Sequence, residues 1–298
     1  MSQLSVSITA ATIFMIACGN SDRVGNTVTV KADANNTITI PETSINTTIE
    51  DVKKTRNEIL SALIAVMKSE NDEHIPFDEP LHEYGFQLDG KLRPLWINAY
   101  RHRERKFGFN GDWYRTWTSK GAPNVPQVCA DFIVDSIDRT AGTWYSLDRN
   151  HPQRVIGRYD FRTDIKSHGL DPRRIPDLVS FFETHNEWFQ FVYKKETTDS
   201  SPPVGQTKNL TKWLHEHGTA LGDILFIRGK APWDYEKEIH WHSLIVSEVD
   251  ENDKVTKVFG NPSYAIERSI SGEMGRAPKR TVSYIIRLKN EFLNKINP

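Results

Sequence analysis

Four strand-like segments in the last third of the chain constrain its fold more than any other feature. They lie at residues 222–228 (GDILFIR), 239–249 (IHWHSLIVSEV), 254–259 (KVTKVF) and 281–288 (TVSYIIRL). Consecutive strands with short connections favour an antiparallel sheet. Residues 187–195 (EWFQFVYKK) alternate between apolar and polar side chains and predict a further strand.

Helical patterns precede most of this sheet. Thr47 and Glu50 have the spacing of a capping box, and apolar residues at helical intervals follow them. The segment CADFIVDSIDRTAG places its apolar residues on one helical face and ends at a glycine. The expected helical segments are 48–69, an amphipathic stretch within 91–120, 129–142, 176–185 and 208–217. This order predicts an α+β fold with N-terminal helices packed on an antiparallel β-sheet.

Composition limits the classes of protein to which the chain can belong. Its 298 residues include 38 basic and 39 acidic side chains, which gives a formal net charge of −1. This balance argues against a nucleic-acid-binding protein, because such proteins normally carry a basic excess. Hydrophobic residues make up 38% of the chain, enough for one sizeable core. Two cysteines are too few for a disulfide-stapled scaffold or a zinc site of four thiolates.

The N-terminus has the pattern of an export signal. Residues 1–21 carry no charged side chain, and residues 8–18 form an apolar run too short to span a bilayer. The run ends in Ala17-Cys18-Gly19, which resembles the lipobox of bacterial lipoproteins, although no Lys or Arg precedes it. The resemblance implies a signal peptide over 1–18 and lipidation of Cys18. The alternative is a buried apolar helix that ends in Cys.

The same segment predicts where the protein acts. A lipid on Cys18 would anchor the chain in a bacterial cell envelope, in the periplasm or outer membrane, whereas an unlipidated chain would be secreted. Residues 19–47 are rich in Asn, Thr, Ser, Val and Asp and suit a flexible tether to the membrane. A short strand at VTV or TITI within the tether is compatible with its composition.

Cys129 is the strongest candidate for chemistry. It is the one cysteine that stays free if Cys18 is lipidated, and it opens the helix expected at 129–142. Backbone N–H groups and the helix dipole at that end stabilise a thiolate and lower the pKa of the thiol. A thiolate is the nucleophile of cysteine hydrolases and needs a nearby histidine as base. The alternative is an inert buried cysteine, a common fate of this residue.

Two His-x-His pairs supply candidate bases. His240 and His242 alternate along an expected strand and therefore share one face of it. His215 and His217 stand at the end of an expected helix, where exposure to solvent or capping is the simpler role. At least one histidine of the strand pair is expected to be structural.

The order of these residues resembles the NlpC/P60 superfamily of papain-like cysteine hydrolases and its CHAP-type relatives. In that superfamily a Cys opens a helix, a Gly-Asp strand follows, a later strand begins with His, and a polar residue lies on the next strand. Here the order is Cys129, Gly222-Asp223, His242 and Asn261. The resemblance implies that Cys129 is the nucleophile, His242 the base and Asn261 the residue that orients the imidazole. The Cys129 N–H, at a helix start, is an available oxyanion donor.

The resemblance also predicts the domain boundaries. It implies a papain-like domain over 113–298 with an insertion at about 148–210, and it leaves 48–112 as an N-terminal helical region. The chain departs from the family around the nucleophile, where Val128-Cys129-Ala130-Asp131 replaces Asp-Cys-Ser/Ala-Gly. The separation of 113 residues between Cys and His also exceeds that of compact members.

A turn centred at residue 252 predicts the register between the histidine strand and the next one. Counting outward from this turn pairs residue 261 with about 243, within one residue of His242. Asn261 should therefore reach His242 more easily than His240, which lies about 6–7 Å further along the strand. His240 is instead expected to contact substrate, together with Trp117 and Trp241.

By resemblance, the expected function is hydrolysis of an amide bond in the peptide part of bacterial peptidoglycan. Such an endopeptidase or amidase needs no cofactor and no metal. A LytM-like zinc peptidase is one alternative, in which His240 and His242 join a His-x-x-x-Asp pair. His168-Gly169-Leu170-Asp171 is one residue short of that spacing. The other alternative is a non-catalytic envelope lipoprotein that uses the same scaffold for binding.

Overall fold

The chain divides into two compact units, Met1–Glu58 and Ile59–Pro298. The computed structural model describes residues 22–24, 27–33, 36–41, 56–70, 75, 76, 78, 81–83, 86–88, 90, 92–196, 207–229, 240–261, 265–276 and 280–297. Cys18 and the signal segment expected at 1–18 lie outside the described residues. Among the helices that are described, none combines the length and apolar character needed to cross a bilayer.

The first unit contains a small antiparallel sheet. Its strands are β1 (Asp22–Val24), β2 (Thr27–Asp33) and β3 (Asn36–Pro41), paired in the order β1-β2-β3. β2 includes the VTV segment and β3 includes TITI, so strands form at both places that the sequence indicated. The segment expected to be a tether therefore contains a three-stranded meander.

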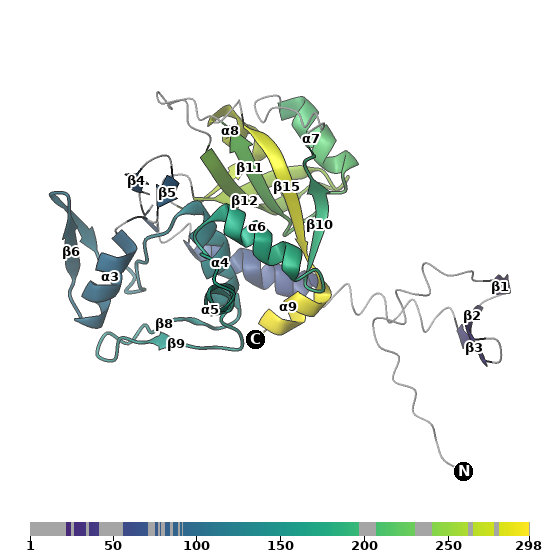
Figure 1. The fold of residues 1–298 in the computed structure, drawn as a ribbon, viewed down its shortest axis with the longest axis horizontal. Coiled ribbons are helices and arrows are strands. Elements are labelled where there is room, and N and C mark those ends of the chain that lie inside the picture. Colours follow the sequence, from purple (N-terminus) through teal and green to yellow (C-terminus); the bar gives the residue numbers. More distant parts are fainter. Residues whose placement is uncertain are drawn as a thin grey trace, which may run out of the picture. The chain divides into compact units, whose positions relative to one another are not determined.

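The second unit is built on a six-stranded antiparallel sheet (Figure 1). Its strand order is β10-β15-β11-β12-β13-β14, and each neighbouring pair is antiparallel. The strands are β10 (Phe189–Lys194), β11 (Ile224–Gly229), β12 (His240–Val249), β13 (Val255–Gly260), β14 (Ile266–Ser269) and β15 (Thr281–Leu288). The five strands predicted from the sequence are confirmed, and β14 adds a sixth.

Helices accompany the sheet, and the α+β class is therefore confirmed. Residues 56–70 are helical, which covers the described part of the helix expected at 48–69. The other helices are α3 (Leu92–Arg101), α4 (Cys129–Thr140), α5 (Phe161–Ser167), α6 (Ile175–Thr184), α7 (Thr207–Glu216), α8 (Ile270–Arg276) and α9 (Asn290–Ile296). The sequence did not predict α5, α8 or α9, because seven residues are too few to show a helical period.

Three two-stranded hairpins complete the described elements. They are β4 (Leu81–Glu83) with β5 (Phe86–Leu88), β6 (Lys106–Phe109) with β7 (Asp112–Arg115), and β8 (Trp144–Tyr145) with β9 (Arg154–Val155). Strand β9 has only two residues, and the chain enters α5 six residues later, at Phe161.

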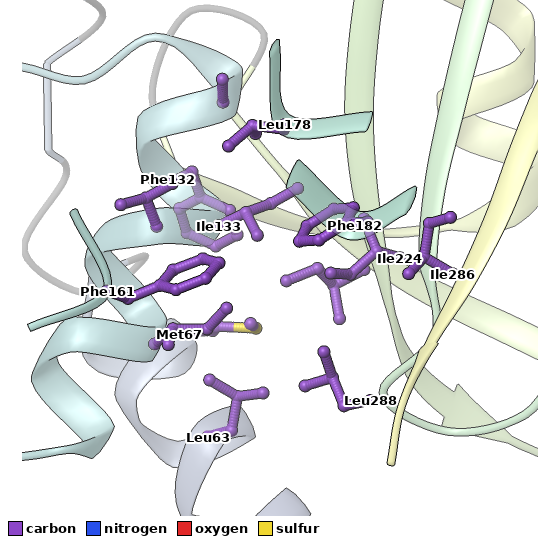
Figure 2. Close-up of a cluster of buried hydrophobic side chains, with 14 of the residues drawn as sticks. Leu63, Met67, Phe132, Ile133, Phe161, Leu178, Phe182, Ile224, Ile286 and Leu288 are labelled. Carbon is purple, nitrogen blue, oxygen red and sulfur yellow. The ribbon is translucent and has the colours of Figure 1, made fainter. Parts of the chain in front are cut away.

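One face of the sheet packs against α4, α5, α6, α9 and the helical residues 59–70, and Figure 2 shows part of this cluster. Leu63 and Met67 of that first helix belong to the same buried cluster as Phe132 of α4 and Ile224 of β11. This helix, which was expected in the N-terminal region, therefore packs into the same core as the sheet. A separate buried cluster around α3 draws residues from both sides of position 113, from Leu92 to Val125.

The opposite face of the sheet packs against α7 and α8. Alternation along the strands turns neighbouring residues to opposite faces, so Leu244 and Val246 lie on this face while Ile245 lies on the other. The cluster on this face comprises Leu210, Leu214, Leu225, Ile227, Leu244, Val246, Val255, Val258, Ile270, Val282 and Ile285. The sheet is thus covered on both sides, and its central strands β11 and β12 are almost fully buried.

The Gly222-Asp223 motif anchors β11 to its neighbours. Gly222 has φ +80°, and a Cβ there would lie 2.6 Å from Leu60 Cδ2, so only glycine fits. The buried Asp223 carboxylate accepts hydrogen bonds from Arg287 of β15 at 2.9 and 2.7 Å and from the Ala220 N–H at 2.8 Å. These bonds connect the start of β11 to β15 and to the residues before the motif.

Candidate active site

Cys129 is the first residue of α4 and is 7% exposed. The chain before it is fixed by two backbone bonds, from the Asp78 N–H to the Gln127 carbonyl at 2.9 Å and from the Gln127 N–H to the Pro76 carbonyl at 3.0 Å. The Asp131 carboxylate accepts a hydrogen bond from the Val128 N–H at 3.0 Å. The helix start that carries the thiol therefore has a well-defined geometry, with backbone N–H groups that lack intrahelical acceptors.

Buried ion pairs hold this end of α4 in place. Arg93 forms a bidentate pair with Asp135 at 2.8 and 3.0 Å, and Arg162 bridges Asp131 and Asp135 at 2.7 Å each. Arg173 Nε adds a bond to Asp131 at 2.8 Å. Burial alone would raise the pKa of Asp131 and Asp135, but the arginine charges outweigh it and lower both. Breaking a buried pair of this kind typically costs about 3–5 kcal/mol.

Strand β12 brings His242 to the thiol. Ser243 Oγ donates a hydrogen bond of 2.7 Å to the Cys129 carbonyl, which ties the strand to the first residue of α4. His242 precedes this serine and is 4% exposed. Burial alone would raise the pKa of the Cys129 thiol, but the hydrogen bond and charge of His242, together with Ser243, outweigh burial and lower it. The sequence-predicted pair of Cys129 and His242 is thus brought together.

His242 also faces a carboxylate. Its Nε2 lies 3.4 Å from Glu273 Oε1 on α8, and Glu273 Oε2 lies 3.5 Å from Arg268 Nη1 on β14. Burial would lower the pKa of His242, but its interactions with Cys129 and Glu273 outweigh burial and raise it. A lowered thiol pKa beside a raised imidazole pKa favours a thiolate–imidazolium pair.

Sequence reasoning missed Glu273. It lies on the seven-residue helix α8, which shows no helical period in the sequence. One local signal was present, because Ser269 is a good N-cap residue and its Oγ accepts a hydrogen bond from the Gly272 N–H at 3.1 Å. That signal could have located the helix, but it could not have shown that Glu273 meets a histidine of β12.

The predicted register of Asn261 is confirmed, whereas the structure shows no hydrogen bond between Asn261 and His242. Leu244 pairs with Gly260 and Val246 with Val258, which places residue 261 beside residue 243. Asn261 is fully buried, and within the described chain neither polar atom of its side chain has a hydrogen-bond partner. The group that faces the His242 ring is Glu273, so the orienting role of Asn261 stays a prediction.

The residues expected to contact substrate lie in different surroundings. His240 is half-buried and pairs with Gly229 on β11. Trp241 packs at the edge of the cluster that contains Cys129 and stacks on Tyr284, with 6.0 Å between ring centroids. Trp117 is 6% exposed and belongs to a separate aromatic cluster around α3. Burial leaves Trp117 little surface for a substrate contact, whereas Trp241 packs against the cluster that contains Cys129.

The residues of the zinc alternative are not arranged as ligands. The His168 ring lies 4.8 Å from that of His185 and 5.4 Å from that of Phe181, at the end of α5. His242 instead contacts Cys129 and Glu273. Within the residues that the structure describes, no three His, Cys, Asp or Glu side chains are placed to hold one metal ion.

Comparisons with known proteins returned no match to a protein-family model, a curated protein or a solved structure. The functional argument therefore depends on the geometry of Cys129, His242 and Glu273.

Glu273→Gln is expected to weaken the thiolate–imidazolium pair. A neutral amide cannot favour the charged imidazole as a carboxylate does, so the pKa of His242 should fall. Loss of the imidazolium charge should raise the pKa of the Cys129 thiol. The rate of its alkylation by iodoacetamide near pH 6–7 should then decrease, by about tenfold for each unit by which the thiol pKa rises. Rates measured between about pH 4 and 10 test this, with Glu267→Gln on β14 as a charge-matched control. Superimposable profiles for Glu273→Gln and the unmodified protein would contradict the pairing.

Proposed function

We propose that the protein is a cysteine hydrolase that cleaves an amide bond, with Cys129 as nucleophile and His242 as base. The observation that carries the proposal is a thiol at the start of α4 beside the buried His242, on a strand that is tied to Cys129 by the 2.7 Å bond from Ser243 Oγ. This arrangement lowers the pKa of the thiol. Perturbed pKa values in a nucleophile and its partner are a property of catalytic pairs. Glu273 supports the same proposal, because a carboxylate beside His242 favours the charged ring.

The chemistry would proceed in two stages. The Cys129 thiolate attacks the carbonyl carbon, an S–C bond forms, and the carbonyl π electrons move to oxygen. The tetrahedral intermediate then collapses, the C–N bond breaks, and the leaving amine takes the proton from the His242 imidazolium. In the second stage neutral His242 takes a proton from water, the hydroxide attacks the thioester, and the S–C bond breaks. The acid product leaves, and the thiolate–imidazolium pair is restored.

The substrate that we propose is the peptide part of peptidoglycan, cleaved by an endopeptidase or amidase. Support comes from the order Cys129, Gly222-Asp223, His242, which resembles the papain-like NlpC/P60 superfamily. The lipobox-like end at Cys18 supports export and attachment to a membrane of the cell envelope, with secretion as the alternative. The proposed reaction needs no cofactor, because a side-chain thiolate supplies the nucleophile.

A second proposal is a non-catalytic envelope protein that uses this scaffold for binding. The burial of the site favours it, since the exposed fractions of Cys129, His242 and Asn261 are 7%, 4% and 0%. A buried cysteine that solvent cannot reach would be chemically inert. The reactivity of Cys129 in the folded protein therefore separates the two proposals.

Iodoacetamide should alkylate Cys129 faster than it alkylates glutathione at about pH 6–7, because a thiolate persists there at a lowered pKa. A Cys18→Ser background leaves Cys129 as the one thiol, and mass spectrometry of the intact protein gives the rate. Alkylation slower than that of glutathione would favour the binding proposal.

EDTA should leave hydrolysis of peptidoglycan fragments unchanged, whereas loss of activity would favour the zinc alternative.

A further inference from the structure

The side chain of Asn261 is buried without a protein partner. Its exposed fraction is 0%, and in the described chain neither Oδ1 nor Nδ2 makes a hydrogen bond. More than about 90% of buried polar groups in proteins are paired, and an unpaired one typically costs about 1–3 kcal/mol. Both polar atoms of this side chain are therefore available to a bound molecule.

Asn261 continues β13 on the face that packs against α4. Phe259, two residues earlier, lies in the cluster of that face, with its ring centroid 6.2 Å from that of Phe132. Gly260 faces the other way, because a Cβ there would lie 2.7 Å from Leu244 Cδ2 and 3.4 Å from His242 Nε2. Since alternate residues of a strand share a face, the side chain of Asn261 is directed with Phe259 toward α4.

The position along α4 follows from the register. Phe132 lies one turn of helix, about 5 Å, beyond Cys129. Asn261 lies two residues, about 6–7 Å, beyond Phe259 in the direction of Ser243. Ser243 Oγ donates to the Cys129 carbonyl at 2.7 Å, so the strand residues at this level meet the first residue of α4. The Asn261 amide is thus placed at the start of α4 beside Cys129.

The start of α4 supplies a second donor at this place. The Val128 N–H is already bound to the Asp131 carboxylate at 3.0 Å. The Cys129 N–H is the next donor along the chain, and a helix of twelve residues gives it no acceptor in its own first turn. An N–H at a helix start and a neutral amide N–H are both suited to an oxygen that becomes negative during a reaction.

We infer that Asn261 Nδ2 and the Cys129 N–H together bind the carbonyl oxygen of the scissile bond and form an oxyanion hole. The inference rests on the proposed hydrolase function. When the thiolate adds to the carbonyl carbon, the π electrons move to this oxygen, which then accepts both N–H bonds. When the C–N bond breaks, the electrons return and the bonds weaken. Asn261 is then a substrate-binding residue, and Glu273 is the residue that orients His242.

Three measurements on Asn261→Ala test this role. Hydrolysis of purified muropeptides should fall by about 10²–10³-fold in kcat, the usual cost of one oxyanion donor. The pH profile of iodoacetamide alkylation should not change, because that reaction develops no oxyanion. The thermal unfolding temperature should stay equal or rise, because the substitution removes an unpaired buried group. Asn252→Ala, in the turn between β12 and β13, is the matched control and should resemble the unmodified protein in all three.

The other outcomes distinguish the possible failures. An alkylation profile shifted in the same way as that of Glu273→Gln would show that Asn261 orients the imidazole and would overturn the inference. Unchanged hydrolysis in Asn261→Ala would overturn it as well. Asn261→Asp preserves side-chain size, and its carboxylate should repel the oxyanion and lower kcat at least as much; retained activity would again contradict the role. An unmodified protein that alkylates but hydrolyses nothing would overturn the proposed function itself.

Discussion

Cys129→Ala is expected to abolish hydrolysis of peptidoglycan fragments. Without the sulfur no thioester can form, and removal of the nucleophile from a unit of this kind typically lowers kcat by on the order of 10⁶-fold. Chromatography of muropeptides after incubation with equal amounts of each protein measures the loss. Residual activity above a heat-inactivated control would mean that another group is the nucleophile.

The fold of the Cys129→Ala variant should persist. Its side chain is small and lies at the end of a helix, at the margin of the cluster on the α4 face of the sheet. Circular dichroism and the thermal unfolding temperature check this. Cys18→Ser is the matched cysteine control. Only membrane attachment is proposed for Cys18, so the purified variant should retain full hydrolysis.

His242→Ala should remove turnover to about the same extent as Cys129→Ala, because residues that act as a unit have non-additive effects. The thiol loses the hydrogen bond and charge that lower its pKa, and the leaving amine loses its proton donor. His240→Ala should lower the rate of hydrolysis by less than about tenfold, which corresponds to the loss of a substrate contact worth about 1.4 kcal/mol. Muropeptide hydrolysis and alkylation at about pH 6–7, measured together, follow both effects.

The buried position of His242 requires a second variant. His242→Gln fills more of the space beside Glu273 and Leu244 than alanine does, so it keeps the comparison valid if His242→Ala unfolds. Equal losses in the His240 and His242 variants would contradict the assignment of the base. Loss in the His240 variant alone would contradict it more strongly.

Local sequence patterns predicted the sheet and its register well. β10 alternates between apolar and polar side chains, whereas β11, β12 and β15 carry short apolar runs typical of buried strands. The count from a turn at residue 252 also placed residue 261 beside residue 243, as the Leu244–Gly260 pair confirms. Register is predictable here because the short turn between β12 and β13 fixes which of their residues pair.

Domain boundaries were less predictable. The helical residues 56–70 looked like part of a separate region, yet Leu63 and Met67 complete the cluster around α4. An amphipathic helix shows which of its faces is apolar, but its sequence does not show which surface that face will cover. The boundary near residue 113 stays a prediction.

Within the candidate site, the sequence was sufficient to identify Cys129 at a helix start and His242 on a strand, because helix periodicity and strand alternation are local properties. It did not identify Glu273, whose helix is too short to show a period and meets His242 only through the pairing of β13 with β14. The lack of a hydrogen-bond partner for the Asn261 side chain in the described chain was equally hidden from the sequence. Charge pairs such as Glu273 with His242 depend on long-range packing, since no local rule links residues 31 positions apart.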